Sequence, residues 1–420
     1  MIRFFLACSL ILFLGVVSAS FGYGLYLLFQ PRESGVVLSA APPAAASAAG
    51  IETLVRAARQ HVKQRQVEQA IVVYRRALAI GPSLEAQLGL AEGEWLAGRE
   101  EVATREFERA LALDRRNPTA LRQLARIHAR QASTWPRAEA LYREYLAVAP
   151  GDAQAQLDLA RLLVWQRNAT AAAELFSQPE VRLLMTPQDR RDYGFALVKI
   201  GRPAEAEPIL ESLVAARPGD DELKLRLAGI RAARGDWASA LPLYRAVLDR
   251  TPDDPEVNLI YGLGLLARGD HPGALGPLAK AAQGLPENGE AALGHARALR
   301  RTGDAKKAAR EYERALRFRE PEAEVIREYA DLLMERREYG KAEAQYQAAL
   351  ARGLRDDRLL VALAGALAAN RKYREAVPFL EEAYARQPTD RLAFDLAKLY
   401  QKTGQNDRAL ELLRKIETSR

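Results

Sequence analysis

The sequence predicts an all-α solenoid of about eleven helix–turn–helix units, preceded by one transmembrane helix. The chain has 420 residues, more than the roughly 250–300 at which one compact core stops growing, so its core must be divided or built serially. It is rich in Ala, Leu, Glu and Arg, which are strong helix formers, and β-branched runs are nearly absent after the N-terminus. A pattern of small and aromatic residues also recurs about every 34 residues from residue 51 onward.

The first predicted element, residues 1–30, is a transmembrane helix or signal anchor. No charged residue lies between Arg3 and Arg32, and residues 4–29 read FFLACSLILFLGVVSASFGYGLYLLF. At a rise of about 1.5 Å per residue, a helix of this length crosses a hydrocarbon layer of about 30 Å. A cleaved secretory signal, cut after Ala19, is the alternative, although its apolar region normally spans only about 7–15 residues. The charges that flank the run weakly favour an N-terminus inside the cell and an exported body.

The second predicted element, residues 31–50, is a linker. It contains the stretch SGVVLSAAPPAAASAAG, which is small, uncharged and interrupted by two prolines. This composition is typical of a flexible tether. The folded body is then expected over residues 51–420.

The body shows a repeat with a nearly constant period. A small residue opens the second-helix signature of each unit, at Ala70, Ala103, Ala138, Ala172, Ala206, Ala240, Ala274, Ala308, Ala342, Ala376 and Ala409. A large apolar side chain follows four residues later, at Tyr74, Phe107, Tyr142, Phe176, Leu210, Tyr244, Leu278, Tyr312, Tyr346, Leu380 and Leu413. Spacings of four within a unit are typical of one helix face, so the pattern predicts paired helices that pack serially.

This pattern resembles the tetratricopeptide repeat (TPR), a helix–turn–helix unit of 34 residues in which small residues allow close packing. Turn sequences such as RGDWASA (234–240) and RGDHPGA (268–274) place a glycine where the first helix ends and an aspartate where the second begins. The proline that ends such a unit is present at Pro82, Pro150, Pro218, Pro252, Pro286 and Pro388. The resemblance implies a right-handed superhelical solenoid with a concave groove for a protein partner.

Two departures from the repeat are expected to change its geometry. The turn over residues 131–139 carries one extra residue, which should alter the angle between its helices. Pro179 and Pro187 predict a bend between residues 177 and 188. Such a bend would separate residues 51–178 from residues 187–420, whereas the unbroken period favours one continuous solenoid.

The composition argues against several functional classes. The net charge of +7 is modest and Arg and Glu are interleaved, so nucleic acid is not an expected partner. Cys8 is the only cysteine, which excludes an intramolecular disulfide or a Cys-based zinc site. The sequence contains neither GxGxxG nor GxxxxGK[ST], and His61, His128, His271 and His295 lie without ligand spacing. We therefore expect no cofactor, no metal site and no enzymatic activity.

The resemblance implies that positions five, nine, twelve and thirteen of each unit face the groove. The basic residues at or beside these positions are Arg56, Arg59, Lys63, Arg122, Arg126, Arg130, Arg161, Arg191, Lys199, Arg297, Arg300 and Arg301. The intervening units present small or apolar residues, namely Gly229, Ala232, Leu263, Leu266, Gly365 and Ala368. Guanidinium groups on successive helices are suited to carboxylates, which predicts an acidic protein segment or an anionic polysaccharide as the ligand. In the alternative interpretation these residues are ordinary solvated surface, partly neutralised by acids such as Glu92 and Asp331.

Together these features predict a bacterial, non-catalytic scaffold or adaptor. It would be a single-pass inner-membrane protein with its repeats in the periplasm. Proteins of similar layout serve exopolysaccharide synthesis and export, which is the process we expect. The alternative is a chaperone-like assembly factor for envelope proteins such as c-type cytochromes. A cytoplasmic regulator of lipopolysaccharide synthesis is a third possibility, but that family carries CxxC pairs that this chain lacks.

Overall fold

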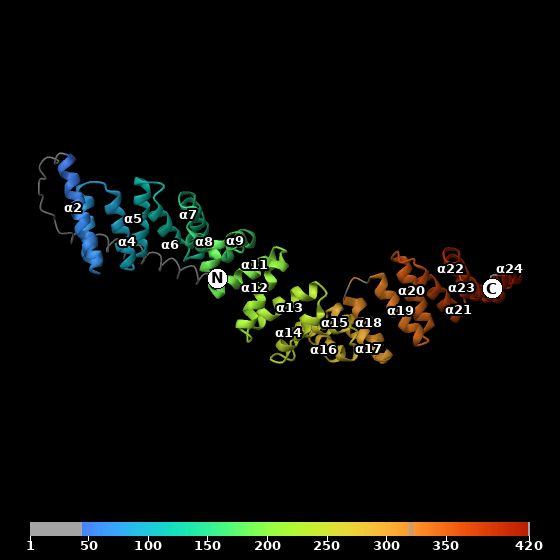
Figure 1. Cartoon of the computed structure of the whole chain (residues 1–420). Coiled ribbons are helices and arrows are strands. Elements are labelled where there is room, and N and C mark those ends of the chain that lie inside the picture. The colour runs from blue at the N-terminus through green and yellow to red at the C-terminus, as the bar shows by residue number, and fades with distance from the viewer. Residues whose placement is uncertain (1–43, 319, 321, 419–420) are drawn as a thin grey trace, which may run out of the picture. The chain divides into compact units, whose positions relative to one another are not determined.

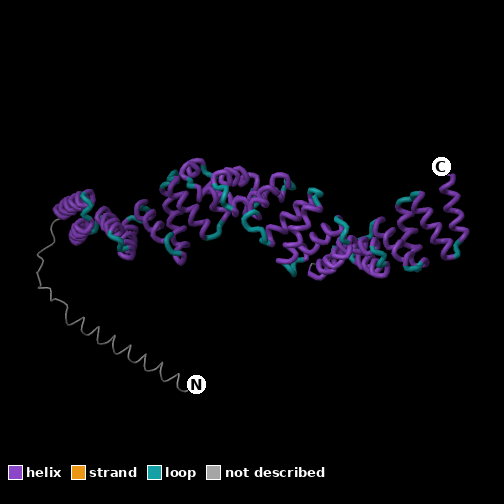
Figure 2. Tube along the Cα trace, turned by 90° about the horizontal axis from the view of Figure 1, so that it is seen from below, coloured by secondary structure: helices purple, strands orange, loops and turns teal. Residues whose placement is uncertain are grey.

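The computed structural model describes residues 44–318, 320 and 322–418. These residues form 23 α-helices and one 3-10 turn, and within them no strand occurs (Figures 1 and 2). The predicted membrane segment, residues 4–29, lies outside this described part. Among the described helices, none combines the length and the apolar character that a membrane crossing requires.

The chain divides into two compact units, residues 1–150 and residues 151–420. The first unit contains three helix pairs: α2 (Ala44–Lys63) with α3 (Val67–Ile80), α4 (Leu84–Leu96) with α5 (Glu100–Leu113), and α6 (Pro118–His128) with α7 (Trp135–Val148). Helix α2 starts six residues before the predicted end of the linker, because its alanines have the highest helix propensity. The extra residue between α6 and α7 is accommodated by a 3-10 turn, Ala132–Thr134.

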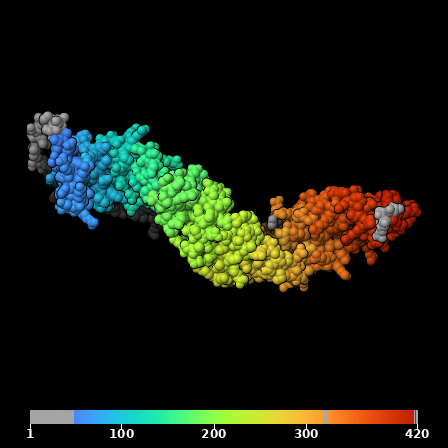
Figure 3. All heavy atoms as spheres, in the orientation of Figure 1, coloured from blue at the N-terminus to red at the C-terminus, as the bar shows by residue number. Residues whose placement is uncertain are grey.

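The second unit continues the same pairing with eight helix pairs and one short additional helix. Its helices are α8 (Ala153–Trp165), α9 (Ala169–Phe176), α10 (Pro179–Leu184), α11 (Pro187–Lys199), α12 (Pro203–Ala216), α13 (Asp221–Ala233), α14 (Trp237–Leu248), α15 (Pro255–Ala267), α16 (His271–Gly284), α17 (Gly289–Arg301), α18 (Ala305–Phe318), α19 (Ala323–Glu335), α20 (Tyr339–Ala351), α21 (Asp357–Ala369), α22 (Tyr373–Arg386), α23 (Asp390–Thr403) and α24 (Asn406–Thr418). Side chains fill the spaces that separate the ribbons (Figure 3).

Each unit has two layers of helices. Within a pair, the second helix packs on its own first helix and on the first helix of the next pair. Neighbouring first helices also touch one another, as in α2 with α4, α15 with α17, and α19 with α21. We call the surfaces of these two layers the first-helix face and the second-helix face.

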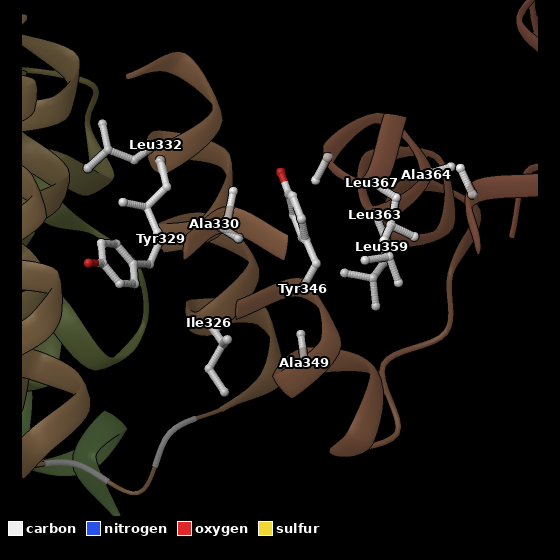
Figure 4. Close-up of a cluster of buried hydrophobic side chains, with 14 of the residues drawn as sticks. Ile326, Tyr329, Ala330, Leu332, Tyr346, Ala349, Leu359, Leu363, Ala364 and Leu367 are labelled. Atoms are coloured by element: carbon white, nitrogen blue, oxygen red, sulfur yellow. The ribbon is translucent and has the colours of Figure 1, made fainter. Parts of the chain in front are cut away.

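The predicted small residues are the points of closest packing. All eleven of the alanines that open the second-helix signatures are buried. In the first helices, a Cβ atom added to Gly262 would lie 2.5 Å from Cγ of Leu278, so no larger residue fits there without displacing the leucine. In the second unit, the ring of Tyr346 lies between Ala330 of α19 and the leucines of α21 (Figure 4). The close helix packing predicted from the sequence pattern is confirmed.

The turns between the paired helices share one conformation, except the turn between α6 and α7, which contains the 3-10 turn. A glycine occupies the left-handed region in six of them, for example Gly235 and Gly269, both with φ 80°. The following aspartates cap the second helices, as predicted: Asp270 accepts a hydrogen bond from the backbone N–H of Gly273 at 2.9 Å. In four other turns this position is an arginine, with φ between 59° and 64°: Arg65, Arg167, Arg337 and Arg371. A side chain with a Cβ in this region strains the backbone by roughly 1–2 kcal/mol.

The segment where a bend was predicted contains an additional helix. Helix α9 ends at Phe176, six residues earlier in its pair than most second helices, and α10 follows from Pro179 to Leu184. Thr186 then caps α11, in a capping box completed by Asp189. Both prolines stand at the first turn of a helix, where the missing N–H is not needed. The whole segment lies inside the second unit.

Candidate functional site

A cavity of about 870 Å³ lies on the first-helix face of the second unit, between α15, α17, α19 and α21. Three of the predicted basic residues, Arg297, Arg300 and Arg301, lie on its wall. Leu263 and Leu266, predicted as part of an apolar zone, form another wall. The structure therefore brings a basic zone and an apolar zone together in one cavity.

Most of the charge in this cavity is already neutralised by acids of the same chain. The Nε and Nη2 atoms of Arg297 donate to the two carboxylate oxygens of Glu328 at 2.9 and 2.8 Å. Arg300 donates to Glu335 at 2.5 Å and to the backbone carbonyl of Glu328 at 3.1 Å. These bonds join α17 to α19, so they stabilise the contact between successive repeats.

The same arrangement continues from α19 to α21. Arg327 donates to Asp356 at 2.6 Å, and Arg358 donates to Asp331 at 3.0 Å. The hydroxyl of Tyr346 donates to Asp331 at 2.7 Å. Burial, followed by the negative charge of Glu328, raises the pKa of Tyr312 at the back of the cavity to about 12.

Arg301 differs from its neighbours. Its side chain is exposed, and it makes no ion pair with any described residue. Arg358 is also open to solvent, with 69% of its side chain exposed. The cavity therefore presents its positive charge to a ligand mainly through these two guanidinium groups.

The other predicted residues of the second unit lie outside this cavity. Arg161 makes a bidentate pair with the buried Asp189, at 2.7 and 2.8 Å, and so links α8 to α11. Arg191 pairs with Glu222 and lies over the ring of Phe195. Lys199 is exposed, and its Nζ lies 3.4 Å from the backbone carbonyl of Arg167. Arg161 and Arg191 therefore connect repeats in the same way as the arginines of the cavity.

The first unit has a smaller cavity on its first-helix face, between α2, α4 and α6, with a volume of about 390 Å³. Two predicted residues, Arg59 and Lys63, line it opposite Leu88 and Leu96, and Leu96 is 61% exposed. Arg59 pairs with Glu85 across the mouth. Lys63 is exposed and has no ion pair within the described residues. This cavity combines an available cation with an exposed apolar wall, and two acids, Glu85 and Glu92, also line it.

The predicted cluster on α6 lies beside this cavity, which α6 lines through Thr119. Arg122 lies over the ring of Tyr145, and Arg130 lies over Trp95 and pairs with Glu100 at 3.0 Å. Arg126 is exposed and makes no ion pair in the described part of the chain; the same is true of Arg56 on α2.

Sequence reasoning named Asp331 as a neutralising acid but missed Arg327 and Arg358, together with Glu328, Glu335 and Asp356. The signal was present in the spacing. Arg161 meets an acid 28 residues later, Arg327 one 29 residues later and Arg297 one 31 residues later. An acid slightly less than one repeat after an arginine lies on the next first helix and can neutralise it. Over the described residues, no group of three or more His, Cys, Asp or Glu side chains is placed to hold a metal ion.

Comparison with known proteins identifies the repeat. Two family models, both described as tetratricopeptide repeat, match the chain. One matches residues 197–262 and 367–418, and the other matches residues 55–118 and 329–391. No curated protein matches the chain significantly.

Several solved structures are similar in fold. YrrB, described as a TPR protein with an unusual peptide-binding site, is 22% identical over 44% of this chain and 95% of its own, with a TM-score of 0.37. Naa15/Naa10 bound to HypK-THB is 18% identical over 88% of this chain and 63% of its own, with a TM-score of 0.44. MamA from Desulfovibrio magneticus RS-1 is 19% identical over 42% of this chain and 93% of its own, with a TM-score of 0.35.

Proposed function

Because this chain contains tetratricopeptide repeats, which act as protein-interaction scaffolds, we propose that it is a non-catalytic scaffold whose first unit binds an acidic segment of a partner protein. The cavity between α2, α4 and α6 is the observation that carries the proposal. It joins Lys63 and the exposed guanidinium of Arg59 to the apolar wall formed by Leu88 and Leu96. A segment with a carboxylate next to an apolar side chain would satisfy both walls.

Two neighbouring cations support the same surface. Arg56 and Arg126 are exposed and lack acidic partners among the described residues, so no internal ion pair has to break when a ligand binds. In the second unit, by contrast, a ligand would have to compete with Glu328 and Glu335 for the guanidinium groups. Charge that remains unneutralised also accelerates encounter with an acidic partner.

The test is binding of a fluorescein-labelled peptide of alternating Glu and Leu residues, followed by fluorescence anisotropy. The variant Lys63→Glu with Arg126→Glu should weaken binding at least about fivefold, because each close charge pair contributes roughly 0.2–1 kcal/mol and each reversal adds repulsion. The matched control is Arg76→Glu with Arg105→Glu, two exposed arginines on α3 and α5 without acidic partners in the described chain. If both variants lost the same peptide affinity, the effect would come from net charge alone, and the proposal would be contradicted.

The proposal extends to membrane attachment through residues 4–29 and to a periplasmic position of the repeats in a bacterial envelope. It rests on the length and apolar character of that segment. A cysteine at the exposed position Gln401, in a Cys8→Ser background, should react with a membrane-impermeant maleimide in intact spheroplasts. Labelling only after lysis would overturn the proposed orientation.

Exopolysaccharide synthesis or export is the process that we propose for this scaffold. Competition between the Glu–Leu peptide and an anionic polysaccharide such as alginate tests whether the polymer itself binds to the first-helix face of the first unit. Displacement of the peptide by alginate would favour direct polymer binding. If an unfolded apocytochrome displaces the peptide and alginate does not, the chaperone-like alternative is favoured.

A further inference from the structure

Helix α18 carries a line of cations on the second-helix face of the second unit. Lys306, Arg310 and Arg317 are exposed, and none of them makes a hydrogen bond or ion pair through its side chain with a described residue. Separations of four and seven residues place all three on one side of the helix, along about 16 Å. Two further cations flank the line, but they are paired: Lys307 with Asp304 at 2.9 Å and Arg314 with Glu311 at 3.1 Å. We call Lys306, Arg310 and Arg317 the α18 stripe.

The α18 stripe costs the helix stability. Lys306 and Arg310 are like charges at positions i and i+4, which destabilises a helix by roughly 0.2–0.5 kcal/mol. Lysines at the second and third positions also oppose the helix dipole, which favours acidic residues in the first turn. No other second helix in the described chain begins with two lysines. The pair with Asp304 compensates Lys307, whereas Lys306 and Arg310 make no ion pair with a described residue, so their unfavourable placement indicates a binding role.

A groove of about 450 Å³ opens beside the C-terminal end of the stripe, between α18 and α20. Arg317 and Lys341 are its cations, of which Lys341 also pairs with Glu338 at 2.9 Å, and Leu316 and Ala344 give it apolar surface. The acid in the groove, Glu313, already accepts a hydrogen bond from the hydroxyl of Tyr329 at 2.7 Å. The groove therefore continues the stripe with a site that has both positive charge and apolar wall.

We propose that the α18 stripe and this groove form a second binding surface, which takes an acidic segment of a partner protein laid along α18. Charge complementarity identifies the occupant: its carboxylates face Lys306, Arg310 and Arg317, and an apolar side chain enters the groove against Leu316. An anionic bilayer fits less well, because a flat surface cannot reach an apolar wall that lies inside a groove. This surface is formed by second helices of the second unit, whereas the cavity of the first unit is formed mainly by first helices. The inference goes beyond the proposed function and does not depend on it.

The test uses the full chain in a background of Lys63→Glu and Arg126→Glu, which removes cations from the first-helix face. A fluorescein-labelled peptide of Glu, Ala and Leu serves as the probe. Replacing the stripe by Lys306→Gln, Arg310→Gln and Arg317→Gln should weaken binding about tenfold, because three ion pairs of roughly 0.5 kcal/mol each are lost. The control Arg76→Gln, Arg105→Gln and Arg115→Gln removes the same charge from exposed arginines elsewhere and should change binding less than twofold.

Three outcomes overturn the proposal. The first is unchanged peptide affinity in the stripe variant. The second is loss of binding to vesicles of phosphatidylglycerol and phosphatidylcholine with no effect on the peptide, which would identify a membrane surface. The third is a lower melting temperature of the stripe variant, which would show that the stripe is structural. The expected result is an equal or higher melting temperature, since like-charge repulsion is removed.

Discussion

The first-helix faces of the two units both carry basic residues, but these residues differ in whether they form ion pairs within the chain. In the second unit, Arg297 and Arg300 reach across to acids of the next first helix. In the first unit, Lys63 and Arg126 make no ion pair with a described acid, although Glu92 lines the cavity of Lys63. The difference shows that an arginine at a groove position is not by itself a ligand-binding residue. It joins two repeats where it reaches an acid of the next first helix, and it is open to a ligand where it does not.

The largest effect on the second unit is expected from removing Asp189, the buried acid that pairs with Arg161. Only 3% of the Asp189 side chain is exposed; it pairs with Arg161 and also completes the cap of α11. Asp189→Ala should lower the free energy of unfolding by about 3 kcal/mol, because it leaves Arg161 without its partner and removes a helix cap. Denaturant unfolding followed by circular dichroism measures this. Asp192→Ala is the control on the same helix, and a loss of similar size there would show that Arg161 is not the reason.

The same pair predicts an acid-sensitive second unit. Burial acts to raise the pKa of Asp189, but hydrogen bonds from Arg161 and Thr186 outweigh it and hold the pKa below its usual range. A lowered pKa means that the stabilisation is complete above the unfolded value of about 3.9 and is lost as the pH falls through the folded pKa. The difference in unfolding free energy between wild type and Asp189→Asn should be constant from pH 7 to about 5 and shrink below about 4. If the difference in unfolding free energy grew on acidification, the pKa of Asp189 would be raised in the folded protein, contrary to this prediction.

A direct contrast of the two units uses one arginine from each. Arg297→Ala should cost about 1 kcal/mol of stability, a modest value because its bidentate pair with Glu328 is partly exposed. The free energy of unfolding of Arg126→Ala should stay within about 0.5 kcal/mol of wild type, because this side chain makes no ion pair with a described acid. Hydrogen exchange of the α17 and α19 amides would localise the first effect. Equal costs for both variants would erase the distinction between the units.

The smallest expected effect concerns a feature that the units share. Arg65 in the first unit and Arg337 in the second occupy the left-handed turn position that other repeats give to glycine. Either residue replaced by glycine should stabilise the protein by about 0.5–1 kcal/mol, since relief of backbone strain exceeds the entropy that glycine adds to the unfolded chain. Gly235→Ala, at φ 80°, should destabilise it by about 1 kcal/mol. Thermal melts of the three variants test whether this turn behaves alike in both units.

The fold was predictable because its determinants are local and repeated. The small residue at Gly262 and the large residue at Leu278 meet within one helix pair, so their spacing in sequence reports their contact in space. Helix α10 and the 3-10 turn at Ala132–Thr134 could not be predicted in the same way. A single departure from the repeat indicates that the structure changes there, but it does not indicate which structure forms.

The candidate site was predictable only in part. The sequence placed Arg297, Arg300 and Arg301 together, and the structure agrees that they share a cavity. It did not indicate that Glu328 and Glu335 neutralise the first two, because that depends on how successive first helices are offset. The lack of an ion pair at Lys63, despite Glu85 and Glu92 in the same cavity, likewise follows from contacts between helices, which composition does not encode.

Contacts restricted to adjacent helix pairs also have a consequence for synthesis. Within each unit, a helix pair packs on the pair made just before it, so a growing chain does not need a distant segment before it can fold. The first unit can be complete and ready to bind while the ribosome is still translating the second. A partner present at the site of translation would then meet the Lys63 cavity before the α18 stripe exists.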